Sequence, residues 1–395
     1  MHLQKLASVV LISSLFSCSV LGQEIDEKIL SQDRLNIFDY SKKQNSENNS
    51  KLIKDNVAPT INLKYQKNFT ETFDTTQSFI TIDQPIFKSG GIYSAVKYAN
   101  VNYKYNNLTV EEQKKELIKQ VSTLLFNLNI IDLNIKKNEF LLKNAKIDIQ
   151  RKKEQVLNGF LDTSYLDKAI IEANTVKNSL ADLYYQKEEL QNNFNNLASK
   201  KYTEFDLPKL TMVDKDNFLE NSLELIKAKA DIKQKDYLVS MSASQYLPNV
   251  SASMNYNHYH DTDENLAITD ETKTNYSVQV SMPIDFSALN DIESTRLEYL
   301  KTKLNLNNII LEEQNFYKTK LSKIDMLDRK KQIAKEDYEL YDSLLKIIVE
   351  EKNAQLKTQS DVDTLANSQK IKSLEVEIFE LQKQIEILEI YTKII

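Results

Sequence analysis

The chain has 395 residues and a net charge of −6, with only four glycines and five prolines. A loop-rich globule needs more of both residue types, so the composition indicates long elements joined by few turns. The acidic balance argues against a partner that is a nucleic acid. Three histidines and one cysteine leave no material for a zinc or iron–sulfur site, and no nucleophile, base and orienting group form a catalytic pattern. We therefore expect that the protein is not an enzyme and binds neither a cofactor nor a metal ion.

The N-terminus is typical of a secretory signal peptide. Lys5 supplies a positive charge, residues 6–16 form a short apolar core, and cleavage after Gly22 would remove residues 1–22. The alternative is a lipoprotein signal, which would lipidate Cys18. Beyond this leader no apolar run reaches the ~18 residues of a membrane-spanning helix. A membrane crossing would therefore require strands that close into a barrel.

A duplicated strand-to-helix joint divides the rest of the chain into two repeats. Residues 81–91 alternate between apolar and polar side chains and then turn into a helical pattern, and residues 276–286 do the same. A second pair of similar strand segments covers residues 59–65 and 248–256. The residues at the joints are Pro85, Gly90, Gly91 and Pro283. This internal duplication predicts two copies of strand, strand, long helix and long helix.

The repeats set the expected domain boundaries. A polar N-terminal segment covers residues 23–57, with a weak helical pattern over 29–40 and, over 42–50, either a loop or a helix with little apolar face. The first repeat covers 58–200, with strands over 60–69 and 78–87 and a helical hairpin over 92–198. After a link over 201–216, the second repeat covers 217–395, with a helix over 218–243, strands over 248–258 and 275–286, and a hairpin over 289–395.

Heptad spacing in the long helical stretches predicts antiparallel hairpins with one narrow apolar seam per helix. The first stretch would be roughly 100 Å long and ends at Asn158-Gly159. The returning helix carries the seam Leu166, Ala169, Ala173, Val176, Leu180, Leu183, Lys187, Leu190, Phe194 and Leu197, in which only Lys187 is polar. The last helix carries Ile371, Leu374, Ile378, Leu381, Ile385 and Leu388.

Each strand has one apolar face and one polar face and is close to the ~9–11 residues that cross a bilayer. A half-buried soluble sheet would show the same alternation. Four strands cannot close a membrane barrel, so a membrane protein would need several chains, and three would supply twelve strands. The hydrophilic loop from His258 to Thr274 is then expected outside the cell, with His258 and His260 as exposed loop residues rather than ligands.

The order of these segments resembles the TolC-type outer-membrane efflux proteins. The resemblance covers almost the whole mature chain and is carried by residues 84–91, 158–162, 196–198, 247–248 and 282–286. It implies a mainly α fold with β: tandem repeats whose hairpins form a periplasmic α-barrel, and four strands per chain in a trimeric twelve-strand barrel. It also implies a homotrimer in outer-membrane lipid of a Gram-negative bacterium, with most of its mass in the periplasm. The partners would be a periplasmic adaptor and an inner-membrane RND or ABC transporter.

The two hairpin turns are the expected functional sites. By the resemblance, the second turn holds the pore gate, with candidates Asp361 and Asp363. Lys357 lies one helical turn before Asp361 and is the nearest candidate partner by sequence, although a partner on another protomer is equally possible. The first turn would dock the adaptor, with candidates Gly159, Phe160, Leu161, Asp162 and Ala169. The family often has an acid where this chain has Tyr165. The alternative role for such residues is helix capping, by Thr163 or Ser164 at one turn and Ser360 or Asp361 at the other.

Two functions fit the sequence. The first is a passive exit duct from the periplasm to the outside, in a tripartite efflux or type I secretion system. The second is a non-channel protein, either a periplasmic coiled-coil spacer or an envelope assembly protein that uses the same hairpins for docking.

Overall fold

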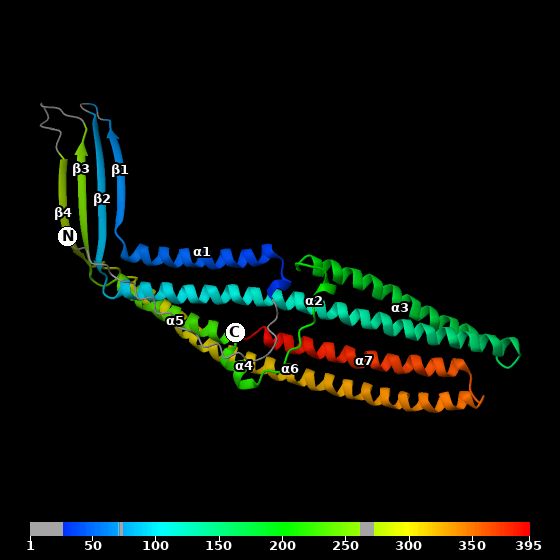
Figure 1. The fold of residues 1–395 in the computed structure, drawn as a ribbon. Coiled ribbons are helices and arrows are strands. Elements are labelled where there is room, and N and C mark those ends of the chain that lie inside the picture. The colour runs from blue at the N-terminus through cyan, green and yellow to red at the C-terminus, as the bar shows by residue number, and fades with distance from the viewer. Residues whose placement is uncertain (1–26, 70, 72–73, 261–271) are drawn as a thin grey trace, which may run out of the picture.

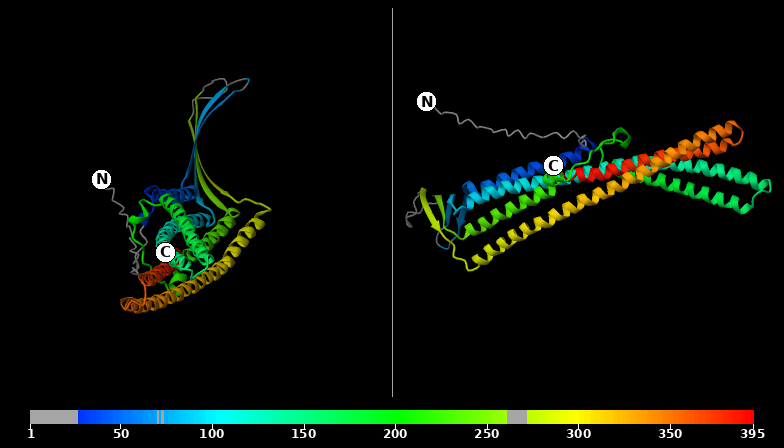
Figure 2. Two further views of the ribbon diagram at one scale, coloured as in Figure 1. Left: turned by 90° about the vertical axis from the view of Figure 1, so that its right-hand side faces the viewer. Right: turned by 90° about the horizontal axis from the view of Figure 1, so that it is seen from below.

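A computed structural model describes residues 27–69, 71, 74–260 and 272–395. The signal peptide, Cys18 and residues 261–271 of the expected loop lie outside this described part. The chain is an elongated body of helices with a sheet projecting from one end (Figures 1 and 2). Its elements are α1 (Gln32–Val57), β1 (Thr60–Asn68), β2 (Thr75–Phe87), α2 (Gly91–Leu157), α3 (Thr163–Asn195), α4 (Lys215–Asn221), α5 (Leu223–Gln245), β3 (Asn249–Tyr259), β4 (Thr272–Ser281), α6 (Ala288–Asn353) and α7 (Gln359–Tyr391). Two short 3-10 helices, Glu27–Ile29 and Tyr202–Glu204, complete the described part.

The strand bounds differ from the expected ones because pairing partners set them. β4 covers 272–281 rather than 275–286, since Ser281 pairs with Asn249, the first residue of β3, and the ladder has no partner beyond it. β2 starts at Thr75, where it pairs with Asn68. His258, expected both as the end of a strand over 248–258 and as the start of the loop, belongs to β3 and pairs with a neighbour on each side.

Most of the polar N-terminal segment, residues 32–57, forms the single helix α1, so a loop over 42–50 was the wrong one of the two alternatives. α1 buries none of its residues and packs along α2. Leu35 and Phe38 pack against apolar residues of α2 and α3. Farther along the helix the contacts are polar: Lys42 Nζ contacts Glu111 at 3.1 Å, and Asn45 donates a hydrogen bond to Asn107 at 3.0 Å. Each repeat therefore begins with a helix before its strands, α1 in the first and α5 in the second.

The helix expected over 218–243 is two helices. α4 ends at Asn221, and Ser222 then caps α5 by accepting a hydrogen bond from Leu225 N at 3.4 Å. Ser222 also forms a bridge to Ile394, which ties this break to the C-terminal segment.

α2 is the central helix of the body, with α1, α3, α5 and α7 packed around it (Figure 1). The single narrow seam expected for it is therefore wrong. One apolar cluster joins it to α3 and the N-terminal segment through Ile29, Leu30, Ile118, Val121, Leu125, Leu128 and Phe194. A second cluster joins it to α4, α6 and α7 through Phe126, Leu210, Val213, Phe218, Tyr317, Ile324, Ile387, Leu388 and Ile390.

The α3 seam is confirmed. All ten expected seam residues are buried or half-buried, while nearly all the residues between them are exposed. Its one polar member, Lys187, forms an ion pair with Asp132 at 2.7 Å across the hairpin, and this hydrogen bond raises the pKa of Lys187.

None of the helices in the described residues has the length and apolar character needed to cross a membrane.

Candidate functional site

The four strands form one antiparallel sheet in the order β1-β2-β3-β4, with β1 and β4 at its edges. The register aligns one row of residues straight across it, namely Ile61, Ile82, Met254 and Tyr276. The next row is Asn62, Thr81, Asn255 and Asn275. Because neighbouring rows point to opposite faces, one face of the sheet is apolar and the other polar.

Among the described residues, no element covers the apolar face of the sheet. Leu63 is 75% exposed and Tyr276 is 77% exposed, and Ile61, Val278 and Val280 are similarly open. Removing each such side chain from water is worth roughly 1.5–3 kcal/mol. The face therefore requires an apolar environment, while the opposite face of amides and hydroxyls is suited to water.

Both hairpin turns lie at the end of the molecule opposite the sheet (Figure 1). α2 ends in a Schellman turn: Phe160 N donates to Gln155 O at 2.9 Å, and Gly159 has a φ of +71°. α6 ends in the same way, with Leu356 N donating to Glu351 O at 2.9 Å and Gln355 at a φ of +61°. At this second turn a glutamine, rather than a glycine, therefore takes the left-handed conformation.

The helices that leave these turns are capped by other residues than expected. Asp162 caps α3 by accepting a hydrogen bond from Ser164 N at 2.8 Å, so Thr163 and Ser164 are not the cap. Thr358, rather than Ser360 or Asp361, is the cap of α7. Asp361 contributes to a capping box, in which Thr358 N donates to Asp361 Oδ2 at 3.0 Å.

Asp361 also links the two hairpins. Arg151 on α2 donates from Nη2 to Asp361 Oδ1 at 2.8 Å, so the two carboxylate oxygens have different partners. The hydrogen bonds from Thr358 lower the pKa of Asp361, and the charges of Arg151 and Lys357 lower it further. Lys357, the expected partner of Asp361, therefore has the smaller effect on this pKa, and Asp361 forms its ion pair with Arg151.

The link continues as a polar seam between α2 and α7. Asn144 donates to Thr364 O and to Ser368 Oγ, both at 3.3 Å, and accepts from Asn367 at 2.8 Å. These contacts between the hairpins near the turns are hydrogen bonds and ion pairs, whereas the cluster around Phe126 joins the same two helices farther along through apolar contacts. The polar contacts separate at low cost because water replaces them.

The sequence analysis missed Arg151. It lies within a polar helical stretch, and its partner is 210 positions away. The one available signal was its rarity, because the sequence contains only four arginines.

The remaining candidates at the turns differ in accessibility. Phe160 is 80% exposed at the apex of the first turn, with Gly159 and Asp162 exposed and Leu161 half-buried beside it. Ala169 is only 1% exposed, because it packs in the α2–α3 seam. Asp363 accepts a hydrogen bond from Gln359 on its own helix at 2.7 Å.

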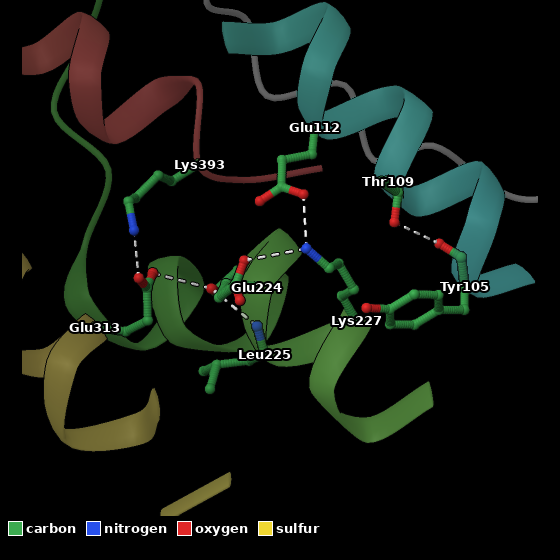
Figure 3. A network of polar contacts seen from close by, with 9 residues as sticks. Tyr105, Thr109, Glu112, Glu224, Leu225, Lys227, Glu313 and Lys393 are labelled. Carbon is green, nitrogen blue, oxygen red and sulfur yellow. Dashed lines mark hydrogen bonds and ion pairs between the residues drawn. The ribbon is translucent and has the colours of Figure 1, made fainter. Parts of the chain in front are cut away.

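A second polar cluster lies where α2, α5, α6 and the C-terminal segment meet (Figure 3). Lys227 lies between Glu112, at 2.7 Å, and Glu224, at 3.8 Å. Burial raises the pKa of Glu224. Glu313, 3% exposed, accepts from Ser222 at 3.1 Å and pairs with Lys393. These pairs fasten the C-terminal segment to the helices, which is a structural role.

No family model matches the sequence, and no curated protein matches it. Solved structures do match. VceC, an outer membrane protein of Vibrio cholerae, aligns with a TM-score of 0.73 at 12% identity, over 93% of this chain and 95% of that chain. The CmeC outer membrane channel of Campylobacter jejuni aligns with a TM-score of 0.72 at 12% identity, over 93% of this chain and 84% of that chain. The MtrE outer membrane channel of Neisseria gonorrhoeae aligns with a TM-score of 0.70 at 13% identity, over 93% of this chain and 87% of that chain.

The chain therefore has the fold of the TolC-type outer-membrane channels. The expected architecture is confirmed: long helical hairpins and one four-stranded antiparallel sheet per chain.

Proposed function

We propose that this protein is a passive outer-membrane channel, the exit duct between the periplasm and the cell exterior. The observation that carries the proposal is the sheet with one exposed apolar face and one polar face. A bilayer would cover the first face, and water in a pore would fill the second. The fold of the matching outer membrane channels supports the same function.

The open sheet edges support a homotrimer. β1 and β4 each leave one row of backbone groups without a strand partner in the described chain. Such edges are not tolerated in hydrocarbon, so β4 of one copy would pair with β1 of the next. Three copies would close a barrel of twelve strands. A mass of about three times the 45.8 kDa chain in mild detergent, slightly less after loss of the leader, is the expected result. A monomer with ordered strands would contradict it.

The direction of the helices supports the orientation. The sheet would cross the outer membrane, and both turns would reach into the periplasm. A label on a cysteine introduced at Asn68, at the far end of β1, should react on intact cells, and one at Phe160 should not. The reverse labelling would overturn the orientation.

The turns would meet the partners of the channel. Phe160 and Leu161 offer an apolar apex to a periplasmic adaptor, which would connect the channel to an inner-membrane RND or ABC pump. Ala169 would act indirectly, through the packing of the hairpin. Crosslinking from position 160 to a co-expressed adaptor tests this step.

The α6–α7 turn would form the gate. Three copies of Asp361 and Asp363 would approach one axis, and a ring of carboxylates attracts cations. Since Asp361 is neutralised by Arg151, Asp363 would carry more of the cation preference. Lys357→Gln should then raise resting conductance less than removal of Arg151.

Conductance in planar bilayers tests the function itself. We expect the purified protein to form ion-conducting pores, and the double variant Asp361→Asn with Asp363→Asn to lose cation preference. If the trimer inserts but conducts no ions under any condition, the alternative of a coiled-coil spacer or assembly protein replaces the channel.

A further inference from the structure

The polar face of the sheet carries few charges. Among the residues that the four strands place on it, the charged ones are Lys64, Asp83 and Lys273. Most of the others are asparagine, glutamine, serine or threonine. Lys273 already has an interaction partner. Lys64 and Asp83 are therefore the two charges on this face whose surroundings decide how it acts on a dissolved ion.

Lys64 and Asp83 lie at different heights on neighbouring strands. Lys64 pairs with Phe79 and Thr60 pairs with Asp83, so the two charged rows are four residues apart. At about 3.4 Å per residue, this is about 13 Å along the strands. Asp83 is nearer the helices, because β2 continues from there toward α2. The row between the two charges is neutral and consists of Asn62, Thr81, Asn255 and Asn275.

Neither charge is neutralised by an ion pair within the described part of the chain. Both side chains are exposed, and Lys64 Nζ lies 5.8 Å from the centroid of the Phe79 ring. Such a cation–π contact orients the ammonium group and leaves its positive charge in place. Lys67, on the apolar face of the same strand, differs because it lies 4.0 Å from Asp74. The polar face therefore presents one net positive level and one net negative level.

We propose that Lys64 and Asp83 form two rings of opposite charge on the inner wall of the barrel. This inference rests on the proposed channel, since three copies of the sheet are needed to make each ring. The threefold axis would place the three copies of Lys64 at one level and the three copies of Asp83 at another. The outer ring would concentrate anions and the inner ring would concentrate cations, by the charge logic of selective pores.

The width of the barrel decides whether these rings act on ions in the pore. Twelve strands about 4.8 Å apart and tilted by about 40° give a circumference of about 75 Å and a radius of about 12 Å. The Debye length is about 10 Å at 0.1 M salt and about 3 Å at 1 M. Each ring therefore acts across most of the lumen at 0.1 M, but only next to the wall at 1 M. The tilt leaves the rings roughly 10 Å apart along the axis, so their potentials overlap only in part.

The test places a thiol at Asn62, between the two levels on the same face. The full-length Asn62→Cys chain is compared with its combinations with Lys64→Gln, Asp83→Asn and Lys67→Gln. Lys67→Gln is the matched control, because it makes the same chemical change on the same strand but on the opposite face. Cys18 is the one native cysteine, so the chain without an added thiol gives the background. The measurement is the rate of reaction with an anionic and with a cationic methanethiosulfonate reagent, in detergent micelles.

The ratio of the anionic rate to the cationic rate reports the local potential. In 0.1 M salt, Lys64→Gln should lower this ratio on the order of threefold, because it removes a unit charge about 7–8 Å from the thiol. Asp83→Asn should raise the ratio by a similar factor, and Lys67→Gln should leave it unchanged. Both changes should disappear in 1 M salt. A ratio that Lys64→Gln or Asp83→Asn leaves unchanged at 0.1 M would overturn the two rings.

A second measurement separates this inference from the channel function. In lipid vesicles, Asn62→Cys should react with these water-soluble reagents and Leu63→Cys should not, because a bilayer would cover Leu63. Equal reaction of the two thiols would contradict the membrane barrel itself and the rings with it. Protection of Leu63→Cys together with an unchanged rate ratio would leave the barrel in place and overturn the rings alone.

Discussion

The contact between Arg151 and Asp361 leads to a quantitative prediction about closure of the proposed channel. The pair joins α2 to α7 at 2.8 Å, with the two side chains 42% and 29% exposed. A pair this exposed is worth about 0.5 kcal/mol, and at most about 1 kcal/mol. If three copies open together, Arg151→Gln removes about 1.5–3 kcal/mol from the closed state. Since 1.4 kcal/mol is a factor of ten, the open population should rise roughly 10-fold to 100-fold.

The assay is resting conductance of the reconstituted protein in planar bilayers. The matched control is Arg329→Gln, because Arg329 makes its ion pair with Asp325 on the same helix, at 2.9 Å, and joins no other element. Asp361→Asn should raise conductance as Arg151→Gln does and should also destabilise α7 by about 1 kcal/mol through loss of the capping box. Identical conductance of Arg151→Gln and Arg329→Gln would refute the idea that this contact holds the hairpins closed.

Three further predictions concern stability and pH. Gly91→Ala should destabilise the fold by about 1–3 kcal/mol, because an added Cβ would lie 2.3 Å from Ser244 Oγ; Ser244→Ala should restore part of the loss in thermal unfolding. Residues 159 and 355 both have a left-handed backbone, which glycine adopts at the lowest cost. Gln355→Gly should therefore stabilise the α6–α7 turn by about 1 kcal/mol, and Gly159→Ala should destabilise the α2–α3 turn by a similar amount. The two variants should shift Tm in opposite directions, and shifts of the same sign would contradict this reasoning. The pKa of Asp361 is lowered in the folded state, so its contribution is complete above the ordinary carboxyl pKa of about 3.9 and is lost as pH falls through the lowered value. The conductance difference between the unmodified chain and Arg151→Gln should thus persist at pH 5 and vanish only below about pH 4.

Local periodicity determined most of the fold from the sequence alone. The α3 seam was predictable because a heptad records which side of a helix is covered, whatever the covering element is. The two faces of the sheet were predictable from strict alternation in residues 276–282, and the duplication supplied the order of the elements. These patterns identify which face of each helix or strand is covered and how long the element is, because burial restricts the residue type at each position separately.

Tertiary structure decided which element lies against each face. Residues 42–50 of α1 have little apolar pattern to reveal a helix, and the contacts of Lys42 and Asn45 with α2 decide between the helix and the loop. The partner of Asp361 was expected one helical turn away at Lys357, since sequence spacing indicates only near neighbours. The packing of α7 along α2 instead brings Arg151 to it across 210 positions. His258 was expected at the boundary between a strand and a loop, and the register of β2, β3 and β4 places it within the sheet. Pairing between distant segments is a property of packing, and no local pattern records it.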